Sequence, residues 1–445
     1  MDYTQLTTDD KRHMAATIGI ESIDALFEGI PADLRLENPL DIPPAMNEIE
    51  LLDHIGELGG KNQHGSRRIG FLGAGSYDHF IPTVVDDLAD QSEFVTAYTP
   101  YQAEASQGAL QAFYEFQTLV CQLTGMDVAN ASLYEMATAL TEAVLMARNL
   151  TGKRRVVMPT AIHPDAQAVL KTYLRELPLD LVPVTASSGR TDLDDLAGAV
   201  TDDTAAVVVQ SPNFFGCIEP LDRIAPLAQE KGALLIVSVD PISCGLLQPP
   251  GAFGADIVVG EGQPLGIPMS LGGPYLGLMA CKREYLRKMP GRLVGQTTDE
   301  AGRRAFCLTL QTREQHIRRE RATSNVCTNQ GLLALRAAIY LAAMGKRGLA
   351  KVASLCLDKA HYAAERIDAL DGFELRFRAP FFKEFAVRTT KDVGAVLEHC
   401  RQRNILAGAA LGRWHKDLSD CLLIAVTEKR TRQEIDALVD ALDSA

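Results

Sequence analysis

The sequence predicts an α/β protein built on a buried, mostly parallel sheet, followed by a smaller α+β domain. Short apolar stretches alternate with helical patterns from about residue 131 to residue 281. These stretches are apolar on both alternating positions, as in parallel strands that are covered on both faces. After residue 330 the strands and helices follow one another in mixed order, which is typical of an α+β domain.

The first 65 residues predict separate helices rather than a compact domain. A helix over residues 11–17 follows Thr8 and stops at Gly19, and a short apolar face follows at residues 23–27. A further helix over residues 49–58 carries an apolar face and ends at Gly59 and Gly60. Helices of this kind either wrap a partner subunit or pack on their own core, and the sequence leaves both possibilities open.

The alternating region supplies the predicted sheet and its covering helices. Helices are predicted over residues 131–148, 164–176, 192–200 and 222–231. Strands are predicted over residues 155–158, 181–184, 205–209, 234–239, 257–259 and 275–280. Ligands of such sheets bind at the carboxyl ends of the strands, so we expect the functional site at that edge.

The C-terminal part predicts the smaller domain. A helix over residues 332–343 leads into helices over 349–370, 392–403 and 432–442, with strands at 373–377, 385–388 and 422–426. We therefore expect a helical arm over residues 1–65, a large α/β domain over 66–330 and a small α+β domain over 331–445.

Composition narrows the classes of function. The chain has 445 residues and a net charge of −13, which argues against a nucleic-acid or membrane-surface role. We find no signal peptide and no stretch of about 20 apolar residues, so we expect a cytoplasmic protein. The nine cysteines are scattered and form no C-x-x-C motif, and the histidines lack metal-ligand spacing. The sequence therefore predicts reduced thiols and no metal site.

A loop at residues 96–108 is rich in neutral hydrogen-bonding side chains. Tyr98, Thr99, Tyr101 and Gln102 lie here, and Glu104 is the only charged residue. Such side chains suit a partly buried polar pocket, where each donor needs a partner. The alternative is that the tyrosines only cap a core, with their hydroxyls in water.

Several long blocks resemble one enzyme family, the glycine cleavage system P-protein, or glycine dehydrogenase (decarboxylating). The blocks are GAGSYDHFIP at 73–82, the loop at 96–108, LTGMDVANAS at 123–132, MPGRLVG at 289–295 and QTREQHIRR at 311–319. They run in the family's order from about residue 70 to residue 330. The resemblance implies an aspartate-aminotransferase-like fold, that of the fold type I pyridoxal-phosphate-dependent transferases. The length fits the N-terminal half of the one-chain enzyme or its separate α subunit.

One departure from that fold concerns the cofactor lysine. The fold places an aspartate at a strand end, where Asp240 stands, and a Schiff-base lysine some 25 residues later. This chain has no Lys, Arg or His from Gly232 to Cys281. Because a Schiff base needs a primary amine, the resemblance implies the half of the family that lost the lysine. Pyridoxal phosphate is then expected on the β subunit, with Asp240 as a structural or partner-facing group.

The resemblance also implies the reaction and the partners. Together with the β subunit, as αβ or α2β2, the chain is expected to decarboxylate glycine through a pyridoxal-phosphate aldimine. The aminomethyl group passes to the lipoyl arm of H-protein, and carbon dioxide is released. Tyr98, Thr99, Tyr101 and Gln102 are the candidates for the substrate side of the shared site.

Three further sets of residues are weaker candidates for the site. Thr323 and Ser324 are candidates to contact the partner's cofactor phosphate, and the arginines between Arg313 and Arg321 either assist or form a solvated helix face. His79 is a candidate general base or stacking group, although a lone histidine is more often structural.

Two other functions stay open from the sequence. The chain is a complete pyridoxal-phosphate enzyme if an unusual lysine such as Lys231 or Lys282 carries the cofactor. It is otherwise a catalytically silent scaffold or regulatory subunit of such an enzyme. The loop from Tyr98 to Gln102 favours a contribution to an active site, because a pure scaffold has little need for it.

Overall fold

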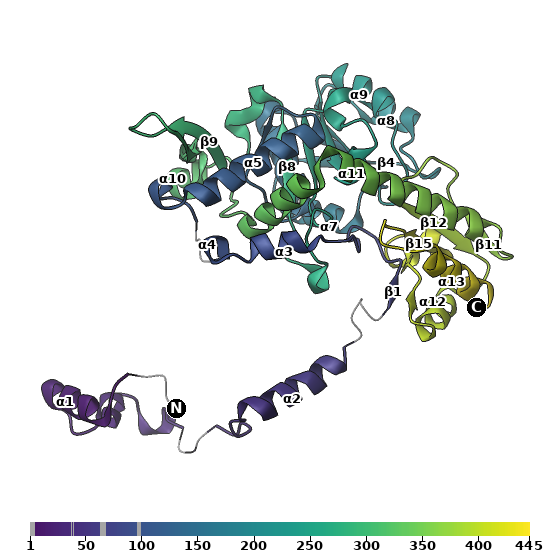
Figure 1. Cartoon of the computed structure of the whole chain (residues 1–445). Coiled ribbons are helices and arrows are strands. Elements are labelled where there is room, and N and C mark those ends of the chain that lie inside the picture. The colour runs from purple at the N-terminus through teal and green to yellow at the C-terminus, as the bar shows by residue number, and fades with distance from the viewer. Residues whose placement is uncertain (1–4, 37, 39, 63–67, 96–98) are drawn as a thin grey trace. The chain divides into compact units, whose positions relative to one another are not determined.

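The computed structural model describes residues 5–36, 38, 40–62, 68–95 and 99–445 (Figure 1). These residues fall into two compact units, residues 1–63 and residues 64–445. The division of the second unit into a large and a small domain near residue 330 stays a prediction.

The N-terminal unit consists of separate helices, as the sequence predicts. Helix α1 spans Thr8–Ile18 and α2 spans Glu48–Gly60, with short 3-10 helices at Ile23–Phe27 and Ala32–Leu34 between them. Thr7 caps α1 by accepting a hydrogen bond from the Asp10 amide, and Gly19 ends it at a φ of 82°. None of the described residues of this unit is buried, so its apolar side chains lie open.

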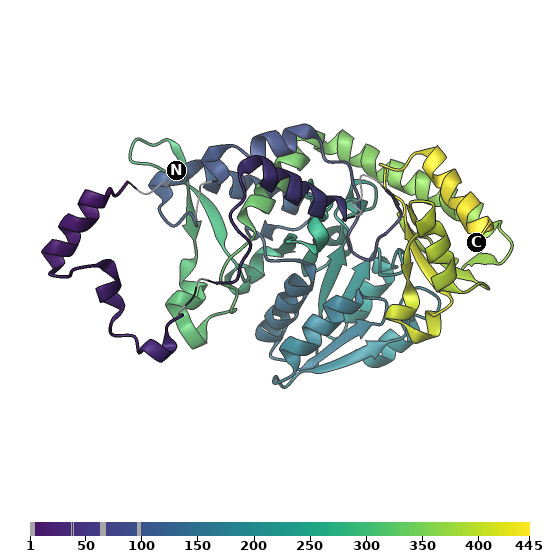
Figure 2. The same cartoon turned by 90° about the horizontal axis from the view of Figure 1, so that it is seen from below.

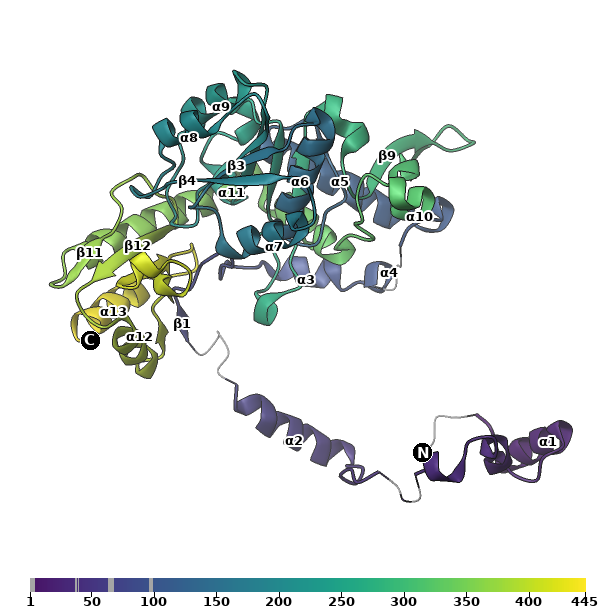
Figure 3. The same cartoon turned by 180° about the vertical axis from the view of Figure 1, so that it is seen from behind.

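The second unit is built on a seven-stranded sheet with the strand order β2-β8-β7-β6-β5-β3-β4. In that order the strands are Val128–Ala129, Gly277–Cys281, Ile257–Glu261, Leu234–Val239, Thr204–Ser211, Arg155–Pro159 and Asp180–Val184 (Figure 3). The prediction of a parallel sheet needs one correction, because β8 runs antiparallel to both of its neighbours. The connection from β7 to β8 contains only a one-turn 3-10 helix, Ser270–Gly272, and a parallel return requires a longer crossover.

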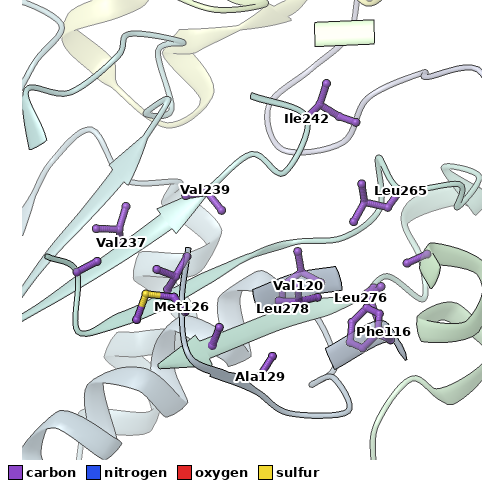
Figure 4. Packing of buried hydrophobic residues seen from close by; sticks show 14 of the residues in the cluster. Phe116, Val120, Met126, Ala129, Val237, Val239, Ile242, Leu265, Leu276 and Leu278 are labelled. Atoms are coloured by element: carbon purple, nitrogen blue, oxygen red, sulfur yellow. The ribbon is translucent and has the colours of Figure 1, made fainter. Parts of the chain in front are cut away.

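Helices cover both faces of this sheet. Helices α6 (Met136–Thr151) and α7 (Pro164–Leu174) pack on one face, against side chains such as Val208, Ile236 and Val259. Helices α5 (Gln107–Thr124), α8 (Leu193–Ala199), α9 (Leu221–Gln229) and α11 (Gly331–Asp368) pack on the other. Figure 4 shows part of that second core, where Val237 and Val239 of β6 lie near Leu276 and Leu278. Each such fully buried side chain stabilises the fold by about 1.5–3 kcal/mol.

The C-terminal part forms a four-stranded antiparallel sheet with the order β11-β12-β15-β14. The strands are Phe373–Leu375, Glu384–Thr389, Cys421–Ala425 and Ala409–Ala410, and helices α12 (Val393–Gln402) and α13 (Arg432–Asp443) pack on it. Helix α11, green in Figure 2, runs from the large sheet to this part and contains the non-helical Gly345. The two helices predicted over 332–343 and 349–370 lie on either side of that glycine.

Several smaller elements complete the second unit. A strand pair that the sequence did not predict joins β1 (Ile69–Gly70) to β13 (Ile405–Leu406), and an unpredicted hairpin joins β9 (Leu293–Thr298) to β10 (Arg304–Thr309). Short helices α3 (Thr83–Ala89), α4 (Ser92–Val95) and α10 (Gln315–Arg318) lie in the connections. Across the described part of the chain, no helix has the length and apolar character needed to cross a membrane.

Candidate functional site

A cavity of about 460 Å³ lies at the carboxyl ends of β5, β6 and β7, where the fold predicts a ligand site. We call it the strand-end cavity. Its volume is within the range of about 300–1,000 Å³ that is usual for small-molecule pockets. Its polar lining includes Gln210, Ser238, Asp240 and Glu261.

The N-terminus of α6 opens on the strand-end cavity and is already occupied by carboxylates of the chain. Glu135 caps the helix by accepting hydrogen bonds from the amides of Ala137 and Thr138. Glu261 accepts one from the Met136 amide at 3.1 Å, and burial raises the pKa of Glu261 to about 7. A helix N-terminus attracts anions, and here Glu135 and Glu261 supply them.

Asp240 is paired with a lysine of the same chain. Lys383, whose side chain is only 2% exposed, places its Nζ 2.7 Å from the Asp240 carboxylate. The same Nζ lies 2.8 Å from His79 Nε2 and 3.7 Å from the centroid of the Tyr77 ring. The neighbouring Glu384 accepts hydrogen bonds from the Ala74 amide and the Tyr77 hydroxyl, and burial raises its pKa to about 7.

His79 links this lysine to a second buried carboxylate. His79 Nδ1 lies 2.6 Å from Glu428, and burial together with the charge of Lys383 lowers the histidine's pKa. The neutral ring therefore accepts from Lys383 at Nε2 and donates to Glu428 at Nδ1. Burial opposes ionisation of Glu428, but the bond from His79 and the Phe80 amide lower its pKa to about 2. His79 thus has two partners inside the chain, and its role as a general base or stacking group stays a prediction.

The strand-end cavity does not fit covalently held pyridoxal phosphate. Lys383 is the one lysine in its described lining, and its ammonium group is held by Asp240. Lys231 and Lys282, the other candidates, are not among the lining residues and pair with Asp202 and Asp256. A phosphate at the N-terminus of α6 would meet the carboxylates of Glu135 and Glu261. Three features that hold the cofactor in this fold are thus missing or filled.

A second cavity, of about 810 Å³, contains part of the predicted loop, and we call it the Tyr101 cavity. Thr99 and Tyr101 line it together with Arg292, His316 and Thr328. Arg292 donates to the Tyr101 hydroxyl at 3.3 Å and to Thr328 Oγ1 at 3.0 Å. The Tyr101 ring also lies 5.5 Å from the guanidinium carbon of Arg292 and has the His316 ring edge-on at 5.9 Å.

The structure brings some of the sequence-predicted residues together. Thr323 and Ser324 line a small adjacent cavity of about 20 Å³, and Arg292 lines both that cavity and the Tyr101 cavity. Gln102 is exposed and precedes a short 3-10 helix at Ala103–Ala105. Tyr98 lies outside the described residues. The catalytic and cofactor-binding roles of all these residues stay predictions.

The arginine-rich segment divides into a structural residue and an exposed set. Arg313 donates to the backbone carbonyls of Met289, Gly291 and Leu310, and so holds this loop onto the MPGRLVG segment. Arg318, Arg319 and Arg321 are exposed, and Arg319 lines the Tyr101 cavity.

Sequence reasoning missed the residues that determine the chemistry of both cavities. Arg292 stands in a quoted family motif, but only the structure shows that it contacts the Tyr101 hydroxyl. Glu135 and Glu261 carried a weak signal, since Glu135 directly precedes a predicted helix start. Lys383 carried none, because 142 residues separate it from Asp240, and no local pattern predicts such a pair.

Comparisons with known proteins agree on one family. The family model described as "Glycine cleavage system P-protein" matches residues 1–442. The probable glycine dehydrogenase (decarboxylating) subunit 1 of Carboxydothermus hydrogenoformans is 49% identical over 442 residues, which cover 99% of each chain. The same-named protein of Anoxybacillus flavithermus is 50% identical over 440 residues, covering 99% of this chain and 98% of the relative.

Solved structures agree with this result. The crystal structure of a glycine decarboxylase (P-protein) of the glycine cleavage system, in inhibitor-bound form, matches with a TM-score of 0.91 at 42% identity over 100% of both chains. A sphingosine-1-phosphate lyase of Burkholderia pseudomallei matches with a TM-score of 0.66 at 16% identity, covering 94% of this chain and 95% of the lyase. The second likeness concerns the fold alone. Together the two confirm the predicted fold type I, aspartate-aminotransferase-like architecture.

Proposed function

The chain belongs to the glycine cleavage system P-protein family, and from that premise we propose that it is the subunit of glycine dehydrogenase (decarboxylating) that holds no cofactor. Its relatives are named subunit 1, which implies a second subunit. Together the two subunits decarboxylate glycine, transfer its aminomethyl group to the lipoyl arm of H-protein and release carbon dioxide.

The observation that carries this proposal is the filled strand-end cavity. Asp240 is neutralised by Lys383, and the N-terminus of α6 is capped by Glu135. Because this chain lacks a free lysine among the described lining residues, the pyridoxal phosphate that supplies the electron-withdrawing chemistry belongs to the second subunit.

The contribution of this chain is the Tyr101 cavity. Tyr101 is 46% exposed in the isolated chain, so its hydroxyl is available to a partner's site. Arg292 is only 7% exposed and is held by Thr328 and Asn329, so it fixes the Tyr101 hydroxyl without itself reaching out. A neutral hydroxyl at a fixed position orients the carboxylate of glycine without the strong hold of a free cation.

The second subunit also needs a docking surface, and the exposed arm supplies one. Ile49, Leu52 and Ile55 of α2 are 75%, 67% and 55% exposed. Burying such side chains against a partner is favourable by about 25 cal/mol per Å² of apolar surface. We therefore assign the arm to contacts with the second subunit, in an αβ or α2β2 assembly.

A reconstitution experiment tests the proposed function. The chain and its candidate second subunit are purified separately, and exchange of labelled carbon dioxide with the carboxyl of glycine is measured for each and for the mixture, with H-protein present. We expect exchange only in the mixture. Equal exchange by the second subunit alone would instead favour the scaffold function, and exchange by this chain alone would contradict the proposal.

A further inference from the structure

We propose that the strand-end cavity is a binding site for a small organic cation of the primary-ammonium class. This inference does not depend on the proposed function, because it concerns a cavity that the subunit contains by itself. It rests on the charge of the lining, on an unpartnered buried hydroxyl and on the size of the cavity.

The charge of the lining is the first observation. Five carboxylates line the cavity, and they are Glu135, Asp165, Asp240, Glu261 and Glu384. Lys383 is the single cation of this lining and is consumed by Asp240. His163 is neutral, because its Nδ1 accepts from the Asp165 amide while its Nε2 donates to the Ala74 carbonyl. The cavity therefore favours a positive ligand and disfavours a phosphate.

The second observation is an unpartnered hydroxyl aimed into the cavity. Ser238 is only 2% exposed, and its hydroxyl makes no hydrogen bond to the described residues. Buried polar groups normally have a partner, so this one points to a ligand. Ser238 alternates with Val237 and Val239, which pack on the opposite face of β6.

The neighbouring strands place two more polar groups beside Ser238. Gln210 of β5 pairs in register with Ser238, and Glu261 of β7 points to the same face of the sheet. An ammonium group has three donors, and the Ser238 hydroxyl and the Glu261 carboxylate offer acceptors at adjacent positions. The Gln210 side chain, which accepts from the His163 amide, leaves its own amide nitrogen for an acceptor on the ligand.

Ionisation of the carboxylates gives the site a pH dependence. Burial raises the pKa values of Glu261 and Glu384 to about 7, so both groups are partly protonated near neutral pH. The groups that face them are Glu135, Asp165, the Asp240–Lys383 pair and neutral His163. A bound cation favours the ionised carboxylates, so its affinity rises between pH 6 and pH 8 and binding releases protons.

Thermal unfolding and calorimetric titration of the full-length chain test the proposal. The probes are ethanolammonium chloride and methylammonium chloride, with sodium chloride at equal ionic strength, inorganic phosphate and pyridoxal phosphate as controls. We expect a saturable rise in the unfolding midpoint of about 2 °C or more with the ammonium probes only, because a ligand that binds the folded state stabilises it. Absence of saturable binding by both ammonium probes, or a larger shift with phosphate, would overturn the proposal.

Variants locate the binding. Glu261→Gln keeps the size of the side chain and its carbonyl acceptor, and Ser238→Ala removes one hydroxyl from an otherwise apolar strand position. Each should lower the affinity for ethanolammonium about tenfold or more. The exposed Glu365→Gln is the matched control and should change nothing. Unchanged affinity in the Ser238→Ala protein, which does not depend on the folding of the glutamate variant, would place the cation elsewhere and overturn the inference.

Discussion

Lys383 connects three groups that the sequence keeps far apart: Asp240, His79 and the ring of Tyr77. In the fold type I architecture the strand-end aspartate faces the cationic nitrogen of the cofactor ring, and here an ammonium group of the chain itself takes that position. Burying a charge is costly unless it is paired. Lys383 and Asp240 each satisfy that need for the other, so neither is free for the cofactor.

Replacing Lys383 by Met should destabilise the protein strongly. The change leaves the carboxylate of Asp240 buried without its cation, which typically costs about 3–5 kcal/mol in the free energy of unfolding. Chemical denaturation of the isolated chain measures this loss, and Lys351→Met on the exposed side of α11 is the matched control. The double variant Lys383→Met with Asp240→Asn should recover part of the loss. A single variant as stable as the control would refute the buried pair.

Glu428 should make the stability of the protein depend on acid pH. Its folded pKa of about 2 lies below its ordinary value of 4.5, so it stabilises the fold above the ordinary value. That contribution, roughly 3 kcal/mol, is lost as the pH falls from about 5 toward 2. Glu428→Gln should therefore lower stability at pH 7 and flatten the stability curve over that window. Parallel curves for wild type and variant would show that the His79–Glu428 bond contributes nothing.

Tyr101 should affect turnover more than stability. Tyr101→Phe removes the hydroxyl that Arg292 holds but keeps the ring, which is half-exposed and packs against His316. A hydrogen bond to a reacting group is worth roughly 1–3 kcal/mol, so glycine exchange in the assembled enzyme should fall about tenfold or more. The melting temperature of the same preparation should barely change. Unchanged turnover would remove Tyr101 from the active site.

At the scale of elements, the long helix α11 depends on one glycine. Gly345 interrupts the helix at φ 58° and ψ −179°, a backbone conformation that only glycine adopts readily. Gly345→Ala should cost about 1–3 kcal/mol in the free energy of unfolding. Gly348→Ala in the same helix is the control, because its φ is not positive. Equal effects of the two changes on urea denaturation would show that the kink carries no strain for alanine.

The sequence predicted elements well where one local pattern decided them. The strand over 234–239 and the α2 region match the structure because an apolar run or a helical face was sufficient. The direction of β8 and the β9–β10 hairpin were missed. Strand direction depends on the length and content of the preceding connection, and the apolar pattern of a strand is the same in either direction.

The candidate site was predicted only in part for a similar reason. The loop around Thr99 and Tyr101 stood out by composition, and both residues line one cavity. Its anchor, Arg292, comes from a segment 191 residues away, and the pairing of Lys383 with Asp240 spans the two ends of the second unit. Such long-range contacts depend on how the chain packs, which one sequence does not reveal.

At the scale of the whole molecule, the arm should determine assembly. None of its described residues is buried, so removal of residues 1–63 should leave the remaining unit folded. We expect the truncated chain to melt at about the temperature of the full chain and to lose its affinity for the second subunit, as measured by size-exclusion chromatography with light scattering. Retained complex formation would assign the partner contacts to the second unit instead.

The central claim is that this subunit holds no cofactor of its own while completing the site of its partner. The most direct measurement is borohydride reduction of the assembled enzyme in pyridoxal phosphate, followed by peptide mapping of both subunits. We predict one stoichiometric adduct, on a lysine of the second subunit, and none on Lys383, Lys231 or Lys282. A stoichiometric adduct on any single lysine of this chain would contradict the account.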